Sequence, residues 1–124
     1  MSRCIIWHNP RCSKSRAGLA YLQERGIEPE IVRYLETPPS VDTLRDVLAK
    51  LGLHPRELMR TREAIYREQG LKTVTDEDRL IEAMAAHPKL IERPVVICGD
   101  RAVIGRPAEA IEALLPQTSE GAPS

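Results

Sequence analysis

Phenylalanine is absent from this sequence of 124 residues, and aromatic residues as a whole supply only 3% of it. The core must therefore be aliphatic, and a surface that stacks the bases of single-stranded nucleic acid is not expected. Net charge is also absent, because 18 basic side chains balance 18 acidic ones. This balance excludes the broad positive surface of a nucleic-acid-binding protein, although it leaves room for a local cluster of one sign.

Cysteine is scarce and widely spaced, since Cys4, Cys12 and Cys98 form no Cys-x-x-Cys motif. The sequence shows no secretion leader, so we expect a cytoplasmic protein whose three thiols are free. The cysteines and the three histidines lack the spacing of zinc ligands, and we expect no metal. No apolar run approaches the roughly 18 residues that span a membrane, so no membrane association is expected.

The hydrophobic pattern predicts alternating strands and helices. Apolar (42%) and charged (29%) residues are close to a globular average, and the length predicts one domain over residues 1–116 with a flexible tail at 117–124. We expect strands at 4–7, 31–35, 95–98 and 102–104. We expect helices at 13–26 with a cap from Ser13 or Ser15, at 41–52 with a cap from Ser40, around Leu58, around Ile65, at 75–87 with a capping box from Thr75, and at 108–115.

This order of elements predicts an α/β fold with one parallel crossover and one hairpin. A β-α-β half joined to a β-β-α half is the thioredoxin- or glutaredoxin-like arrangement of a mixed sheet. The helices at about 40–91 would then be an insertion between the two halves.

Cys12 lies where the first strand ends and the first helix begins. The free N–H groups and the dipole of a helix N-terminus stabilise a thiolate, and the pKa of such a thiol falls from about 8.5 to roughly 3.5–7.5. Basic and hydroxyl side chains surround it within residues 8–16: His8, Arg11, Ser13, Lys14, Ser15 and Arg16. An isolated cysteine is more often inert, but this context favours a nucleophile. Since no second cysteine follows three positions later, an external thiol must resolve any adduct.

Three arginines are candidates for binding an oxyanion. Arg60 follows a short apolar segment, and Arg93 and Arg106 each precede a proline at the edge of a predicted strand. Guanidinium groups bind tetrahedral oxyanions in a bidentate manner. Taken singly, each is more often a solvated surface residue, and their spacing does not show whether the three converge.

Five motifs in order resemble the glutaredoxin-coupled arsenate reductase family of the ArsC type. They lie at His8–Arg16, Tyr34–Ser40, Leu58–Arg60, His87–Val96 and Ile104–Pro107. The resemblance implies a thioredoxin-like fold with a helical insertion. It also implies a catalytic role for Cys12, oxyanion binding by Arg60, Arg93 and Arg106, support of the thiolate by His8 and Ser15, and a cis peptide before Pro94, facing the cysteine loop.

The resemblance further implies reduction of arsenate to arsenite through a covalent thiol–arsenate on Cys12. Glutathione would be the co-substrate and glutaredoxin the protein partner, with no bound cofactor, and we expect a monomer. The family's Cys-Gly-Thr-Ser is replaced by Cys12-Ser13-Lys14-Ser15, which is similar to a separate sub-branch.

Two other functions stay open at this point. The same site would suit a glutathione-dependent oxidoreductase that acts on a protein mixed disulfide or on another oxyanion. The Spx-type regulators share the fold and bind RNA polymerase, but they carry a Cys-x-x-Cys switch, and Ser15 stands where its second cysteine would be.

Overall fold

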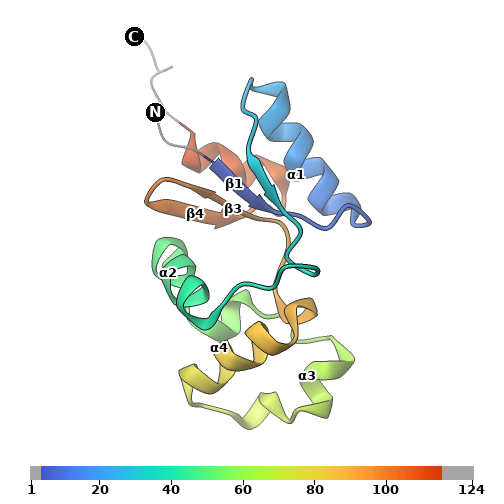
Figure 1. The fold of residues 1–124 in the computed structure, drawn as a ribbon, viewed down its shortest axis with the longest axis vertical. Helices are drawn as coiled ribbons and strands as arrows, with labels where there is room; N and C mark the ends of the chain where they lie inside the picture. Colours follow the sequence, from blue (N-terminus) through green and yellow to red (C-terminus); the bar gives the residue numbers. More distant parts are fainter. Residues whose placement is uncertain (1–3, 116–124) are drawn as a thin grey trace.

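The computed structural model of the chain describes residues 4–115, so the predicted tail at 117–124 and the last residue of the predicted domain lie outside the described residues. A four-stranded sheet has the order β2-β1-β3-β4. Its strands are β1 (Cys4–Trp7), β2 (Glu30–Val32), β3 (Val95–Cys98) and β4 (Arg101–Ile104). β2 pairs with β1 in parallel, while β1–β3 and β3–β4 are antiparallel (Figure 1). The predicted α/β class with a mixed sheet is confirmed.

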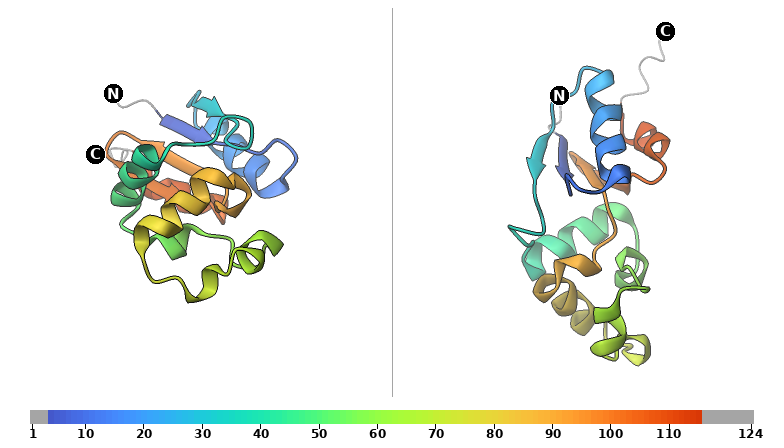
Figure 2. Two further views of the ribbon diagram at one scale, coloured as in Figure 1. Left: turned by 60° about the horizontal axis from the view of Figure 1, so that its bottom comes forward. Right: turned by 90° about the vertical axis from the view of Figure 1, so that its right-hand side faces the viewer.

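Side chains along the strands alternate between two hydrophobic clusters, as the pleat of a strand requires. On one face, Ile6 and Val96 pack with Leu22 of α1 (Ser13–Glu24) and Ile111 of the 3-10 helix η4 (Ala108–Leu114). Figure 2 shows α1 and η4 together on this side of the sheet. All four side chains are fully buried, and each such burial contributes about 1.5–3 kcal/mol. The opposite cluster joins the sheet to the helices between β2 and β3.

Those helices gather below the sheet in Figure 1. They are α2 (Val41–Leu51), η1 (Pro55–Leu58), α3 (Ala64–Glu68), η2 (Leu71–Thr73), α4 (Glu77–Ala86) and η3 (Pro88–Leu90). As predicted, the Ser40 hydroxyl caps α2 by accepting from the Thr43 N–H, and Gly52 ends it with a φ of 70°. Among residues 4–115, no helix is long and apolar enough to cross a lipid bilayer.

The first helix begins differently from the prediction. Neither Ser13 nor Ser15 caps α1, because Cys12 occupies the N-cap position and no side chain accepts a capping hydrogen bond there. Ser15 lies inside the first turn and is fully buried. The predicted cap of the 75–87 helix is also one residue off, since Asp76 rather than Thr75 caps α4 by accepting from the Asp78 N–H.

Two further elements are shorter or tighter than predicted. The strand predicted at 31–35 ends at Val32, because Tyr34–Glu36 turn and the N–H groups of Glu36 and Thr37 both donate to the Arg33 carbonyl. The helix predicted at 108–115 is a 3-10 helix over Ala108–Leu114.

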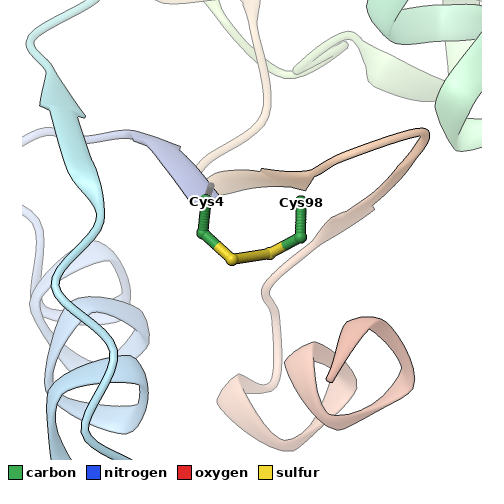
Figure 3. Close-up of a disulfide and its surroundings, with 2 residues drawn as sticks. All are labelled: Cys4 and Cys98. Carbon is green, nitrogen blue, oxygen red and sulfur yellow. A yellow bond between two sulfur atoms is a disulfide. The ribbon is translucent and has the colours of Figure 1, made fainter. Parts of the chain in front are cut away.

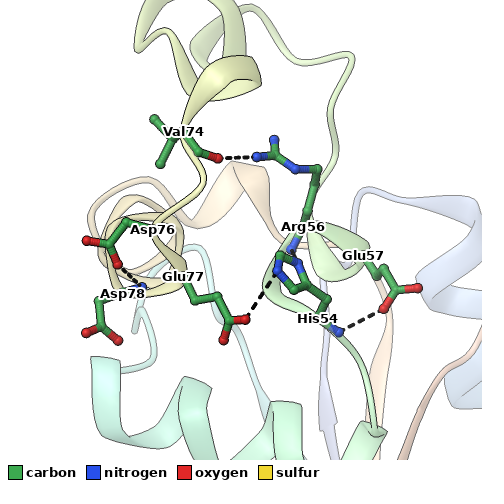
Figure 4. A network of polar contacts seen from close by, with 7 residues as sticks. All are labelled: His54, Arg56, Glu57, Val74, Asp76, Glu77 and Asp78. Atoms are coloured by element: carbon green, nitrogen blue, oxygen red, sulfur yellow. Dashed lines mark hydrogen bonds and ion pairs between the residues drawn. The ribbon is translucent and has the colours of Figure 1, made fainter.

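A network of polar contacts fastens the segment between α2 and α4 (Figure 4). The Arg56 guanidinium donates to the Tyr66 hydroxyl, to the Leu71 carbonyl at 3.1 Å and to the Val74 carbonyl. His54 and Glu57 form a capping box for η1, and His54 Nε2 lies 3.4 Å from Glu77 Oε2. One partly buried side chain on η1 thus links α3 and both ends of η2.

We expect Arg56→Ala to lower the free energy of unfolding by about 2 kcal/mol, because its carbonyl partners lose their charged donor. Urea denaturation measures this change. Arg67→Ala, which removes an exposed arginine from α3, is the control and should stay within about 0.5 kcal/mol of wild type. Equal stability of the two variants would contradict this role of Arg56.

The prediction of three free thiols is wrong for two of them. Cys4 and Cys98 form a disulfide, drawn in Figure 3, with 4.2 Å between their Cα atoms. The cause is the strand register, which sets Cys4 directly opposite Cys98 with both side chains in the same cluster. Cys12 is the free cysteine among the described residues.

Candidate active site

The loop between β1 and α1 presents Cys12 at the start of the helix. Its backbone is fixed by hydrogen bonds from His8 N–H to the Val32 carbonyl (2.8 Å), from Cys12 N–H to the Asn9 carbonyl (3.0 Å) and from Arg16 N–H to the Cys12 carbonyl (3.0 Å). Because Cys12 is the N-cap, it lies at the end of the helix where the N–H groups of the first turn have no intrahelical partners. The thiol is partly exposed and therefore accessible to a small reactant.

The surroundings of Cys12 favour its thiolate. Burial by itself raises the pKa of the Cys12 thiol. The backbone N–H of Ser15, the hydrogen bond from the Arg93 side chain and the backbone N–H of Lys14 act in the opposite direction and outweigh burial. The net result is a pKa below the ordinary value of 9.0.

This lowered pKa predicts a measurable pH dependence. Alkylation of Cys12 by iodoacetamide should rise with pH through a midpoint below 9.0. Between that midpoint and 9.0 the unfolded chain binds more protons than the folded one, so the free energy of unfolding should rise with pH in this window. Cys12→Ser should remove that rise. A midpoint at or above 9.0 would contradict the assignment.

Arg93 makes the closest contact with the sulfur. Its Nε donates to Cys12 Sγ at 3.0 Å. Its Nη1 is buried and has no hydrogen-bond partner among the described residues. A buried charged donor without a partner is costly, and a bound anion would satisfy it. The group is therefore placed to bind an oxygen of a molecule that the thiolate attacks.

Backbone pairing brings together the chain segments that carry the three predicted arginines. Arg60 N–H donates to the Leu90 carbonyl (2.6 Å), and Glu92 N–H donates to the Leu58 carbonyl (2.8 Å). At the end of the same segment, Gly105 N–H donates to the Pro94 carbonyl (2.8 Å). The segment 90–94 therefore carries Arg93 and is hydrogen-bonded to the segments that carry Arg60 and Arg106.

Two cis peptide bonds occur in this region, before Pro94 and before Pro107. The predicted cis Pro94 is thus confirmed. Pro94 also contacts the helix that begins at Cys12, because a Cβ built on Gly18 would lie 2.8 Å from Pro94 Cγ. Only a glycine at this point of α1 leaves room for the proline ring.

His8 and Ser15 contact each other rather than the sulfur through their side chains. His8 Nδ1 lies 2.6 Å from Ser15 Oγ, and the Asn9 N–H donates to the same hydroxyl at 2.9 Å. Burial lowers the pKa of His8, and the charges of Arg33 and Arg16 lower it further, so the ring is neutral at pH 7. Ser15 reaches Cys12 through its backbone N–H. This geometry favours a role for both side chains in fixing the loop.

The sequence model of the ArsC family matches residues 7–114. The chain belongs to the ArsC family. It is 52% identical to an arsenate reductase of Neisseria meningitidis over 117 residues, which cover 93% of this chain and all of that protein. It is 41% identical to an arsenate reductase of Escherichia coli over 123 residues, which cover 98% of this chain and 87% of that protein.

A solved ArsC-family structure supports the fold directly. The arsenate reductase from Vibrio cholerae superposes with a TM-score of 0.89 at 46% identity, covering 92% of this chain and 98% of that one. The assignment of this chain to a Cys-Ser-Lys-Ser sub-branch of the family stays a prediction. Within residues 4–115 of this ArsC-family chain, no group of three or more His, Cys, Asp or Glu side chains is arranged to hold a metal ion.

Tyr34 is a further residue beside the site, and it is not among the predicted site residues. Its side chain is only 1% exposed. Burial raises the pKa of the Tyr34 hydroxyl, the charges of Arg93 and Arg60 oppose this, and Cys12 and Glu92 add to it. Tyr34 therefore lies within electrostatic range of the thiol and two of the arginines. Its position two residues after β2, in a motif matching the family, is the signal that the sequence offers.

Proposed function

We propose that this ArsC-family protein reduces arsenate to arsenite, using Cys12 as the nucleophile. One observation carries the proposal: the Arg93 guanidinium donates to Cys12 Sγ at 3.0 Å while its buried Nη1 is unpartnered. A nucleophile beside an open cationic donor is suited to attack on a tetrahedral oxyanion. The choice of arsenate as the substrate rests on the relatives that are named arsenate reductases.

In the first step, the Cys12 thiolate attacks arsenic and an As–O bond breaks, with the departing oxygen taking up protons to leave as water. Arsenic stays pentavalent, and the product is a covalent thiol–arsenate on Cys12. The backbone N–H groups of Lys14 and Ser15 favour the thiolate before attack. Arg93 binds one oxygen of the substrate, and Arg60 and Arg106 bind the others as the charge redistributes.

The electrons come from external thiols. Glutathione displaces a second oxygen from arsenic as water, forming a bond between its sulfur and arsenic. A glutaredoxin thiolate then attacks the glutathione sulfur, and the electron pair of the S–As bond passes to arsenic, which becomes trivalent. Hydrolysis releases arsenite and regenerates Cys12. An external reductant is needed because Cys4 and Cys98 are bonded to each other at the far end of β1 and β3 from Cys12.

Location, oligomeric state and co-substrate complete the proposal. The protein works as a monomer in the cytoplasm, where glutathione and glutaredoxin are available, and it uses glutathione as a co-substrate without a bound cofactor. The exposed Lys14 adds a cation beside the thiol, which also suits a second candidate function: glutathione-dependent reduction of another oxyanion or of a mixed disulfide.

A coupled assay tests the proposal. Glutathione, glutaredoxin, glutathione reductase and NADPH are mixed with the protein, and arsenate is added last. We expect arsenate to trigger NADPH oxidation with wild type and not with Cys12→Ser. The double variant Cys4→Ala/Cys98→Ala is the matched control and should keep the activity. If wild type gives no NADPH oxidation with arsenate although its Cys12 is still alkylated by iodoacetamide, arsenate is rejected as the substrate. The second candidate function would then remain. It is tested by replacing arsenate with a glutathionylated protein.

A further inference from the structure

Two of the three arginines at the site are held by carboxylates of the chain itself. Arg60 Nη2 lies 2.9 Å from Glu63 Oε2, and Arg106 Nη1 lies 2.9 Å from Glu92 Oε1. The exposed fractions of the four side chains are 28% and 22% for the first pair and 37% and 24% for the second. These pairs are therefore partly removed from solvent, where the attraction between charges is stronger than at an open surface.

The charges of this arrangement nearly cancel before any substrate arrives. Arg93 contacts the Cys12 thiolate, and Arg60 and Arg106 are each paired with a carboxylate, so three positive charges are balanced by three negative ones. A divalent oxyanion entering such a cluster would meet as much negative as positive charge, and like charges at short range oppose binding. For the oxyanion to bind Arg60 and Arg106 as well as Arg93, at least one of the two ion pairs with a carboxylate must break.

Glu92 is the better placed of the two carboxylates. It is adjacent to Arg93 in sequence, and its backbone is fixed to the Leu58 carbonyl. Its charge acts on Tyr34 together with those of Cys12 and Arg93, so it lies within the same cluster. Arg93, by contrast, keeps an unpartnered nitrogen. Arg93 thus has a nitrogen available for an oxyanion, whereas the other two arginines are paired with carboxylates.

We propose that Glu63 and Glu92 are specificity-determining residues that occupy Arg60 and Arg106 in the resting site and are displaced from them by the incoming oxyanion. This inference rests on the proposed function, because it takes these arginines as the oxyanion ligands. Both carboxylates lower the affinity for an oxyanion, and they lower it more for a dianion than for a monoanion. They also keep the arginines near the site while it is empty.

Protection of Cys12 from alkylation tests this proposal without any reduction of arsenate. Iodoacetamide is the uncharged alkylating agent, and without added reductant the disulfide leaves Cys12 as the reactive thiol of the described residues. Sulfate is the divalent tetrahedral anion and perchlorate the monovalent one. Each protein is measured at a pH where its Cys12 reactivity has reached its plateau, so that changes in thiolate content do not enter.

We expect Glu92→Gln to lower the half-protecting sulfate concentration about tenfold and to lower that of perchlorate clearly less. Glu63→Gln should act in the same direction. The matched control is Asp78→Asn, which breaks an ion pair of the same 2.9 Å length between Asp78 and Arg45, on the helices α4 and α2. It should leave both concentrations unchanged.

Three results would overturn the proposal. The first is an unchanged or raised half-protecting sulfate concentration in both glutamine variants, which would mean that the carboxylates only orient the arginines. In that case, protection of wild type by sulfate would still support the proposed oxyanion site. Equal gains for sulfate and perchlorate would also reject the proposal. If sulfate protects Cys12 in none of the proteins, the oxyanion site fails together with this inference.

Discussion

Arg93→Ala is expected to lower arsenate-dependent NADPH oxidation about 100- to 1,000-fold in the coupled assay. The side chain has two tasks that alanine cannot perform. It donates to the Cys12 sulfur, which helps to keep the pKa of that thiol low, and its free Nη1 is placed to bind an oxygen on which charge develops. Removing one preorganised donor of this kind typically costs two to three orders of magnitude.

The pH profile separates these two tasks. Since the Arg93 hydrogen bond and charge lower the pKa of Cys12, its removal should move the midpoint of Cys12 alkylation to higher pH. Arg93→Lys keeps the charge but loses the planar donor, so we expect it to retain the midpoint better than the activity. Arg67→Ala should match wild type. An alanine variant with wild-type activity would show that Arg93 does not take part.

Opening the Cys4–Cys98 disulfide is expected to lower the free energy of unfolding by about 4–5 kcal/mol. The bond joins residues 94 positions apart, and a cross-link over a loop of this size removes much of the entropy of the unfolded chain. The catalytic reaction should be unaffected, because the disulfide lies at one end of the β1–β3 pair. Cys12 follows β1 and Arg93 precedes β3, both at the opposite end of that pair.

Urea denaturation with and without dithiothreitol measures the effect. The double variant Cys4→Ala/Cys98→Ala should be less stable than oxidised wild type, and dithiothreitol should have no further effect on it. Reduced wild type should approach the stability of the double variant. If oxidised and reduced wild type unfold at the same urea concentration, the bridge does not stabilise the fold in the way the loop entropy predicts.

The sequence predicted well those features that depend on neighbouring residues. Ser40 and Gly52 at the two ends of α2, and the apolar runs of β1 and β3, are local signals that no tertiary contact overrides. The position of Cys12 between a strand and a helix is likewise readable from the chain. The predicted helix cap from Ser15 was wrong, because burial against His8 and Asn9, rather than helix propensity, decides where that hydroxyl lies.

Features that depend on register could not be predicted from residue types. The convergence of the arginine segments rests on hydrogen bonds from Arg60 and Gly105 to the segment 90–94, across large sequence separations. The family resemblance implied this convergence, but no spacing in the sequence required it. The Cys4–Cys98 bond depends on the same kind of information, since both residues read as ordinary members of apolar strands until the pairing of β1 with β3 is known.

The contact of Gly18 with Pro94 limits how this protein can be engineered. A glycine inside a helix is normally an easy target, because alanine in its place stabilises a helix by about 1 kcal/mol. Here the added methyl group would meet the ring that follows Arg93 at 2.8 Å, and whatever moves the ring moves the guanidinium beside the sulfur. We therefore expect a thermostability screen that accepts substitutions at position 18 to select folded proteins in which the Arg93 guanidinium is displaced from the Cys12 sulfur.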